Sequence, residues 1–178
     1  HRDLHSFPTR RSSDLDAELA LQETEPVDVA TVAKNIAGVF RDIGSGDDGD
    51  EGTQIRIETK PHGAPSSAFL VDGHEGRLGQ VVTNLLDNAL SFSPPEGAKV
   101  MLEVRAEAAE VVVVVDDQGP GIPPDKLEDV FKRFYSDRPQ SDRKRGKNSG
   151  LGLSISREIV EAHGGTIRAM NIMAAPGD

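Results

Sequence analysis

The chain has 178 residues, which is enough for one domain with a sizeable hydrophobic core. Its 20 Lys and Arg residues against 30 Asp and Glu give a net charge of −10, which disfavours nucleic acid or an anionic membrane as the main partner. The sequence has no cysteine and no apolar run near the roughly 20 residues of a spanning helix, which excludes a disulfide framework, a thiolate metal site and a transmembrane segment here.

The first half of the chain alternates between extended and helical patterns. After a short extended start, apolar residues recur at helical spacing over 27–44, and the acidic, glycine-rich stretch 45–52 predicts a solvated loop. Residues 53–60 alternate between polar and apolar side chains, and 67–73 form a second strand candidate. The strongest pattern is that of 76–92, whose apolar residues form one stripe of an amphipathic helix.

The second half begins with two extended segments. Residues 99–107 and 110–117 predict an antiparallel pair joined by a tight turn. A short helix is expected over 123–135, because proline suits the first turn of a helix. The polar segment 136–149 is long for a plain connection, and structureless segments of this length are typical of lids and binding loops.

The chain continues with a helix over 150–164, which glycine terminates, and a strand over 165–172. Strands and helices alternate, but at least one strand pair is a hairpin. We therefore predict a two-layer α/β (α+β) sandwich, in which a mixed, largely antiparallel sheet carries helices on one face.

Two asparagines stand at one edge of the apolar stripe of 76–92. Asn84 and Asn88 are four residues apart, so they are neighbours on the helix surface. Asparagine is a mediocre helix former, so two of them in register need an explanation. They could be boundary residues hydrogen-bonded to nearby backbone, or they could form part of a site, and both interpretations stay open at this point.

Two glycine-containing motifs have the chemistry of ligand loops. In VVVVVDDQGPGIP, a valine strand ends in two carboxylates, which accept hydrogen bonds, and in a Gly-x-Gly that permits close backbone approach. In NSGLGLSI, small residues lead into a helix start, where free N–H groups and the helix dipole favour phosphate. A plain turn and an ordinary helix entry are the respective structural alternatives.

The ordered set of motifs resembles the catalytic, ATP-binding domain of bacterial sensor histidine kinases, within the gyrase, chaperone, kinase and mismatch-repair ATPase superfamily. The similarity covers residues 27–175 and implies that fold, with an ATP lid between the F box and the second glycine box. The matching motifs are NLLDNA (84–89, N box), DQGPG (117–121, first glycine box), VFKRF (130–134, F box), GLGLSI (150–155, second glycine box) and HGG (163–165, the turn after the last helix).

The resemblance implies nucleotide contacts residue by residue. Asp117 would accept a hydrogen bond from the adenine amino group, while Gly119 and Gly121 would let the backbone wrap the base. Gly150 and Gly152 would bring backbone N–H groups to the phosphates. Further nucleotide contacts would come from Ile122, Phe134, Ser149, Leu151 and Leu153.

The resemblance also implies the catalytic groups. Asn88 would bind Mg²⁺ through its amide oxygen. Asn84 stands where hydrolytic members of the superfamily carry a glutamate that activates water, and because an amide cannot take a proton, it favours transfer to a protein group. Arg133 in the F box and Lys147 in the lid, with neighbouring lid cations, would neutralise transition-state charge.

The sequence departs from the family pattern in three places. Ser91 stands where the family often has Lys or Arg, and Asn148 or Ser149 where the second glycine box often begins with Gly. None of the five histidines has the context of the phosphoacceptor, and we expect structural roles for His74 and His163. A hydrolytic ATPase of the same superfamily, which needs a glutamate at position 84, and a non-catalytic nucleotide-binding module, which Ser91 favours, are the alternative functions.

The ends of the chain have their own interpretation. Residues 1–15 resemble a translated sequencing adaptor, so we regard them as an artefactual leader and not as a genuine basic tail. Residues 16–26 resemble the junction to a dimerisation and phosphoacceptor hairpin, and 27–178 the catalytic domain without its last strand. The expected partners are ATP, Mg²⁺, that hairpin and, indirectly, a response regulator, but no nucleic acid or membrane. The expected location is the cytoplasm, with an inner-membrane sensor as the parent protein.

Overall fold

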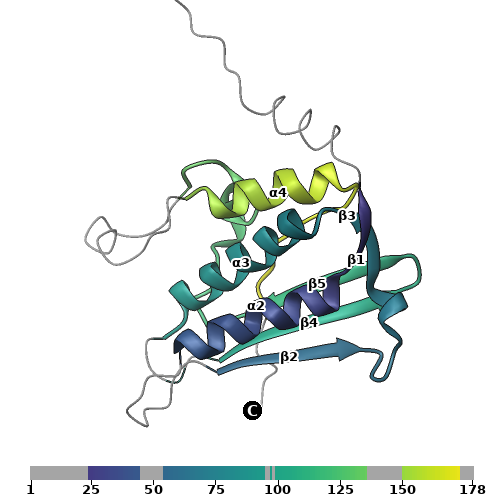
Figure 1. Cartoon of the computed structure of the whole chain (residues 1–178). Coiled ribbons are helices and arrows are strands. Elements are labelled where there is room, and N and C mark those ends of the chain that lie inside the picture. Colours follow the sequence, from purple (N-terminus) through teal and green to yellow (C-terminus); the bar gives the residue numbers. More distant parts are fainter. Residues whose placement is uncertain (1–23, 45–53, 95–96, 98, 136–149, 173–178) are drawn as a thin grey trace, which may run out of the picture.

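The computed structural model describes residues 24–44, 54–94, 97, 99–135 and 150–172. Two small sheets and three α-helices make up its regular structure (Figure 1). A three-stranded sheet has the order β2-β4-β5, with β2 parallel to β4 and β4 antiparallel to β5, and a separate antiparallel pair joins β1 to β3. The element bounds are β1 Glu25–Asp28, α2 Val29–Gly44, β2 Gln54–Lys60, β3 Leu70–Gly73, α3 Glu75–Phe92, β4 Lys99–Glu107, β5 Glu110–Asp116 and α4 Gly152–Ala162.

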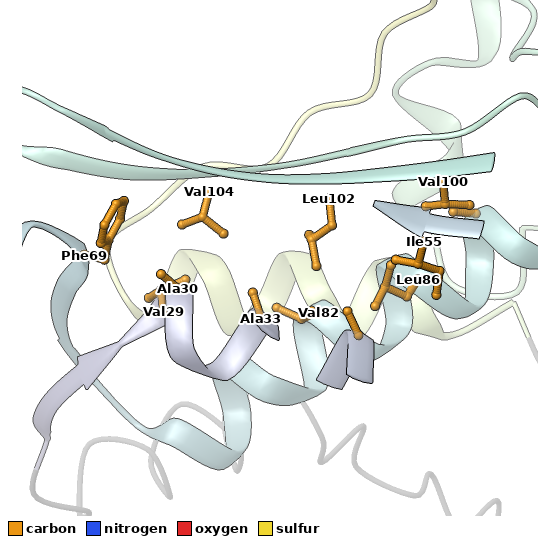
Figure 2. Close-up of a cluster of buried hydrophobic side chains, with 12 residues drawn as sticks. Val29, Ala30, Ala33, Ile55, Phe69, Val82, Leu86, Val100, Leu102 and Val104 are labelled. Carbon is orange, nitrogen blue, oxygen red and sulfur yellow. The ribbon is translucent and has the colours of Figure 1, made fainter. Parts of the chain in front are cut away.

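The core lies between the three-stranded sheet and the helices α2 and α3 (Figure 2). Along β4, Val100, Leu102 and Val104 are at most 1% exposed, because alternate side chains of a strand face the same side. The opposite face of the sheet carries ion pairs among its valines: the ammonium of Lys60 lies 2.7 Å from a carboxylate oxygen of Glu103, and Val114 lies opposite Glu103. The sheet is therefore covered by helices on one face, which was predicted, and α4 packs against α3 (Figure 1).

Local signals explain the confirmed elements. The carboxylate of Asp28 accepts hydrogen bonds from the backbone N–H of Thr31 (3.1 Å) and from its hydroxyl (2.8 Å), which caps the start of α2. The predicted hairpin is present, with Glu107 opposite Glu110 and a two-residue turn that begins at Ala108, whose φ is 47°. The glycine end of α4 is also confirmed, since Gly164 has a φ of 74°.

Two predicted elements are shorter or of another type. Only the second half of 67–73 is a strand, because the 3₁₀ helix η1 (Ser66–Phe69) precedes β3 and brings the ring of Phe69 into the core. The helix predicted over 123–135 is instead two 3₁₀ turns, η2 (Pro124–Lys126) and η3 (Asp129–Phe131). Two of the ion pairs here follow a three-residue spacing, which suits 3₁₀ geometry because side chains at i and i+3 eclipse: Asp129 contacts Lys126 and Lys132.

The strand predicted over 165–172 is absent from the described residues, and that prediction was wrong. The alternation that suggested it is real, since Ile167 and Ala169 are half-buried while Arg168 and Met170 are exposed. The segment lacks a backbone ladder and is attached through a side chain, that of Asn171.

Candidate functional site

A cavity of about 260 Å³ lies between α3, the start of α4 and the segment that carries η3. One wall consists of residues of α3, and another of the turn that leads into α4. The structure therefore brings the predicted N box and second glycine box together, although more than 60 residues separate them in sequence. The lining residues are Asn84, Asp87, Asn88, Val130, Tyr135, Gly150, Leu151, Gly152, Leu153 and Ile155.

Asn84 connects the two walls. Its side-chain NH₂ donates to the carbonyl oxygen of Gly152 (3.1 Å) and lies 3.2 Å from the hydroxyl oxygen of Ser156, which is fully buried. The interpretation of Asn84 as a boundary residue hydrogen-bonded to backbone thus holds for its NH₂ group. The backbone that this group contacts belongs to α4 and not to α3, which carries Asn84. The bond fixes how the second glycine box faces α3.

Asn88 lies one helical turn beyond Asn84 and lines the same cavity. Its backbone carbonyl accepts a hydrogen bond from the hydroxyl of Ser91 at 2.9 Å, so the Ser91 side chain is bonded back to its own helix. Ser91 itself does not line the cavity. An uncharged residue bonded to its own helix thus occupies the position where the resemblance placed a basic side chain.

Position 150 requires glycine, because a side chain would not fit there. Its φ is 71°, and a Cβ would lie 2.9 Å from the carbonyl oxygen of Tyr135. The backbone N–H of Phe134 donates to the carbonyl of Gly150 at 3.0 Å. Phe134, two residues before the predicted lid, is therefore bound to Gly150, which follows it directly, while the lid itself, with Lys147 and Ser149, lies outside the described residues.

The first glycine box is a separate turn that does not line the cavity. The carboxylate of Asp117 accepts a hydrogen bond from the backbone N–H of Gly119 at 2.7 Å. A Cβ on Gly119 would lie 3.2 Å from the carbonyl oxygen of Phe92, so the turn lies against the end of α3, one helical turn past Asn88. Gly121 has a φ of 77°, and the half-buried Ile122 follows it.

Arg133 and Phe134 also lie away from the cavity in this conformation. The guanidinium of Arg133 pairs with the carboxylate of Glu158 on α4, with Nη2 and Oε1 2.6 Å apart. The side chain of Phe134 is 73% exposed, at a φ of 62°. Of the predicted site residues within the described part of the chain, the N box and second glycine box converge on the cavity. The side chains of Arg133 and Phe134 and the first glycine box do not line it.

The F-box segment is held on α4 by charge and ring contacts. The guanidinium carbon of Arg157 lies 4.2 Å from the centre of the buried Phe131 ring, and its Nη2 lies 3.0 Å from a carboxylate oxygen of Glu128.

Within the segment, a hydrogen bond from Lys132 holds the pKa of the Asp129 carboxyl below its usual value, and Asp129 in turn raises the pKa of Lys126. This docking places Val130 and Tyr135 in the cavity wall.

Sequence reasoning missed four of the cavity residues: Asp87, Val130, Tyr135 and Ile155. Helical spacing could have indicated Asp87, which is three residues after Asn84 and therefore on the same side of α3. Ile155 follows Gly152 by three residues and could have been found in the same way. No signal in the sequence points to Tyr135, whose position depends on the docking of the F-box segment.

The two histidines with predicted structural roles connect α3 to α4. The backbone N–H of His74 lies 3.2 Å from Nε2 of His163, and Nδ1 of His163 lies 2.7 Å from the carbonyl oxygen of Ile159. Because Nε2 accepts from a backbone N–H, the proton of the neutral ring belongs on Nδ1, from which it is donated to Ile159. The structural prediction is confirmed for both residues.

Among the described residues, no three His, Cys, Asp or Glu side chains gather to hold a metal ion. Within the same part of the chain, no helix is long and apolar enough to cross a membrane.

Comparison with known proteins identifies the family. A family model described as histidine kinase-, DNA gyrase B-, and HSP90-like ATPase matches residues 73–176. Sensor protein ChvG of Rhizobium meliloti (strain 1021) is 40% identical over 166 residues, which span 93% of this chain but 28% of that protein. The mycobacterial sensor histidine kinase MprB is similar in structure, with a TM-score of 0.62 and 32% identity over 82% of this chain and 83% of that chain.

A full-length kinase, ShkA in complex with AMPPNP, has a TM-score of 0.62 and 26% identity, covering 88% of this chain and 31% of that chain. The family match, the order of the motifs and the paired walls of the cavity agree with one another. The chain belongs to the histidine kinase-, DNA gyrase B- and HSP90-like ATPase family, and within it is the catalytic, ATP-binding domain of a sensor histidine kinase.

Proposed function

We propose that this domain transfers the γ-phosphoryl group of ATP to a histidine on a separate dimerisation hairpin. In this reaction an imidazole nitrogen forms a bond to the γ-phosphorus, the bond to the β–γ bridging oxygen breaks, and ADP leaves. The observation that carries the proposal is the cavity in which Asn84 and Asn88 face the glycine-rich start of α4. Phosphates bind well at such helix starts, because free N–H groups and the helix dipole point toward them.

The cavity fits phosphates better than it fits a metal ion alone. Gly150 and Gly152 line the cavity without side chains of their own, and the described residues contain no cluster of metal-binding side chains that could hold an ion by themselves. Mg²⁺ usually takes few protein ligands and several oxygens of the nucleotide phosphates. We assign the amide oxygen of Asn88 as the protein ligand of Mg²⁺, which would supply charge neutralisation at the phosphates.

Asn84 supports transfer to protein in preference to hydrolysis. Its amide cannot act as a general base, and its NH₂ group is committed to Gly152 and Ser156. Arg133 and Lys147 are our candidates for neutralising charge on the transferred group. In this role Arg133 exchanges its partner, Glu158, for phosphate.

We assign adenine recognition to the first glycine box. Asp117 receives the adenine amino group, and Gly119, Gly121 and Ile122 lie along the base. The predicted lid, 136–149, contains Ser149, and the exposed ring of Phe134 lies two residues before it. The backbone bond between Phe134 and Gly150 joins described residues on either side of this segment, next to the proposed phosphate site. Leu151 and Leu153 complete the nucleotide contacts from the cavity side.

A matched pair of substitutions tests adenine recognition. Asp117→Asn keeps an oxygen that can accept the bond from Gly119 but replaces a carboxylate by an amide, so we expect a loss of about 1–3 kcal/mol of ATP-binding free energy. Asp116→Asn removes the same charge from the neighbouring exposed residue and should leave affinity nearly unchanged. Calorimetric titration with Mg-ATP measures both, and equal affinities for the two variants would contradict the assignment.

The partners follow from the proposed reaction. The parent kinase supplies the dimerisation and phosphoacceptor hairpin, and the phosphoryl group then passes to a response regulator. ATP is a cytoplasmic metabolite, so we place this domain on the cytoplasmic side of an inner-membrane sensor.

Phosphotransfer assays test the function itself. We expect the isolated chain to bind Mg-ATP without phosphorylating itself, because none of its five histidines has the sequence context of the acceptor. Addition of a dimerisation hairpin from a related kinase, such as ChvG, should produce acid-labile label on the hairpin. Label on this chain, or steady release of inorganic phosphate without the hairpin, would overturn the proposal and favour a hydrolytic ATPase. Binding without either product would favour a regulatory module.

A further inference from the structure

We propose that Asn171 is a positioning residue for nucleotide binding, which acts by holding the first glycine box in place. The inference rests on the proposed function, because it assumes that this box receives the base. Asn171 belongs to none of the motifs that indicated the site, and it lies 49 residues beyond its partner, Ile122.

The contact is a two-point clasp. The backbone N–H of Ile122 donates to Oδ1 of Asn171 (2.9 Å), and Nδ2 of Asn171 donates to the carbonyl oxygen of Ile122 (2.6 Å). One side chain thus satisfies both backbone groups of one residue, as a neighbouring strand would do in a ladder. The segment 165–172, which follows α4 and returns toward the sheet, forms no strand but supplies this equivalent (Figure 1).

The clasp acts on a loop that has no regular structure of its own. Residues 117–123 have no regular structure, and Gly121 is in a left-handed conformation with a φ of 77°. A Cβ on Gly121 would lie 3.1 Å from Oδ1 of Asn171, so the amide approaches the glycine backbone closely as well. With both backbone groups of Ile122 bound, the peptides on either side of it cannot rotate freely. The path of the loop from Asp117 onward is therefore fixed before a base arrives.

The chemistry of the clasp is specific. It needs an acceptor and a donor side by side on a short side chain, which an amide provides and a carboxylate does not. A protonated carboxylic acid provides both. Asn171→Asp should therefore lose the bond to the Ile122 carbonyl when the new carboxylate is ionised, and regain it when the acid is protonated. The repulsion between the carboxylate and that carbonyl oxygen favours the protonated form, so the new group should titrate above the ordinary range of aspartate.

The experiment compares ATP affinity at two pH values. At pH 8 we expect Asn171→Asp to bind Mg-ATP about tenfold more weakly than the wild type, the scale of one lost bond and one repulsive contact. At pH 5 the ratio of the two affinities should return to within about threefold. Asp117, Arg168 and the phosphates of ATP are the same in both proteins, so their effects largely cancel in the ratio. Asn171→Ala should bind Mg-ATP weakly at both pH values.

Asn35→Asp is the matched control, because Asn35 is exposed on α2 and receives the same change of charge. It should bind as the wild type does at both pH values. Chemical unfolding of each variant at each pH shows whether it is folded under the assay conditions. Wild-type affinity for Asn171→Asp at pH 8, or equal weakness at pH 8 and pH 5, would overturn the inference while leaving the proposed function intact. A wild type that binds no ATP would overturn both.

Discussion

Replacing Asn88 with alanine is expected to abolish the Mg²⁺-dependent part of ATP binding and to slow phosphoryl transfer by about 100-fold or more. Removal of a residue that only supports a metal ligand lowers metal affinity or activity by about 10–100-fold. The loss of a direct ligand should therefore lower them by at least as much. The described part of the chain offers no neighbouring cluster of carboxylates or imidazoles to take over. The cavity should otherwise remain as it is.

The fold should tolerate this change. Asn88 is half-buried, and alanine is the better helix former, so stability should be unchanged or slightly increased. ATP titrations with Mg²⁺ and with a chelator give the Mg²⁺ dependence, and the hairpin assay gives the rate. Asn35→Ala, the same change on the exposed side of α2, is the control. An unaltered Mg²⁺ dependence of ATP binding in Asn88→Ala would contradict the assignment of Asn88 as the Mg²⁺ ligand.

Gly150→Ala is expected to have the second large effect, because it combines backbone strain with a collision. A left-handed conformation costs a residue with a Cβ about 1–2 kcal/mol, and the new atom would lie 2.9 Å from the carbonyl oxygen of Tyr135 and 3.1 Å from the backbone of Phe134. These atoms are backbone and cannot turn away. The F-box segment must therefore separate from the second glycine box, which should weaken ATP binding about tenfold or more and lower the free energy of unfolding.

Gly38→Ala provides the opposite expectation on the same chain. Gly38 lies inside α2, where an added Cβ would meet no atom of a neighbouring element within 4 Å, so alanine should stabilise the domain by about 0.5–1 kcal/mol and leave ATP binding unchanged. Denaturant unfolding and ATP titration of both variants test the contrast. Equal stabilities for the two would mean that the contact between Gly150 and Tyr135 is not a constraint in solution.

The fold was predictable wherever one face of an element carries a regular apolar pattern. The helix α3 and the hairpin of β4 and β5 are of this kind, because their burial depends on spacing within the element. The segments 123–135 and 165–172 were not predictable. In the first, hydrogen bonds of i+3 type replace those of a helix, and in the second, the partner is a loop residue 49 positions away. Apolar spacing carries no information about either.

The candidate site divides in the same way. Motif order indicated that Asn84, Asn88 and the residues 150–153 belong together, and the cavity does contain them. The bond from Asn84 to Gly152 could not be predicted, since it depends on how α3 crosses α4. The pairing of Arg133 with Glu158 was missed for a similar reason, because a surface arginine can reach several carboxylates and only the docked F-box segment determines which one it meets.

The donor role of Asn84 has a consequence for how such domains can diverge. A glutamate at this position, as in the hydrolytic members of the superfamily, would place a carboxylate against the Gly152 carbonyl, from which it cannot accept a hydrogen bond. Of the two groups that Asn84 contacts, only the hydroxyl of Ser156 could donate to that carboxylate. A lineage that exchanged this single residue would gain a base and at the same moment weaken the attachment between its two cavity walls. Passage from a phosphotransfer domain to an ATP-hydrolysing one therefore requires correlated changes on α4. Asn84 is thus a residue whose replacement by glutamate is constrained by the helix that it contacts.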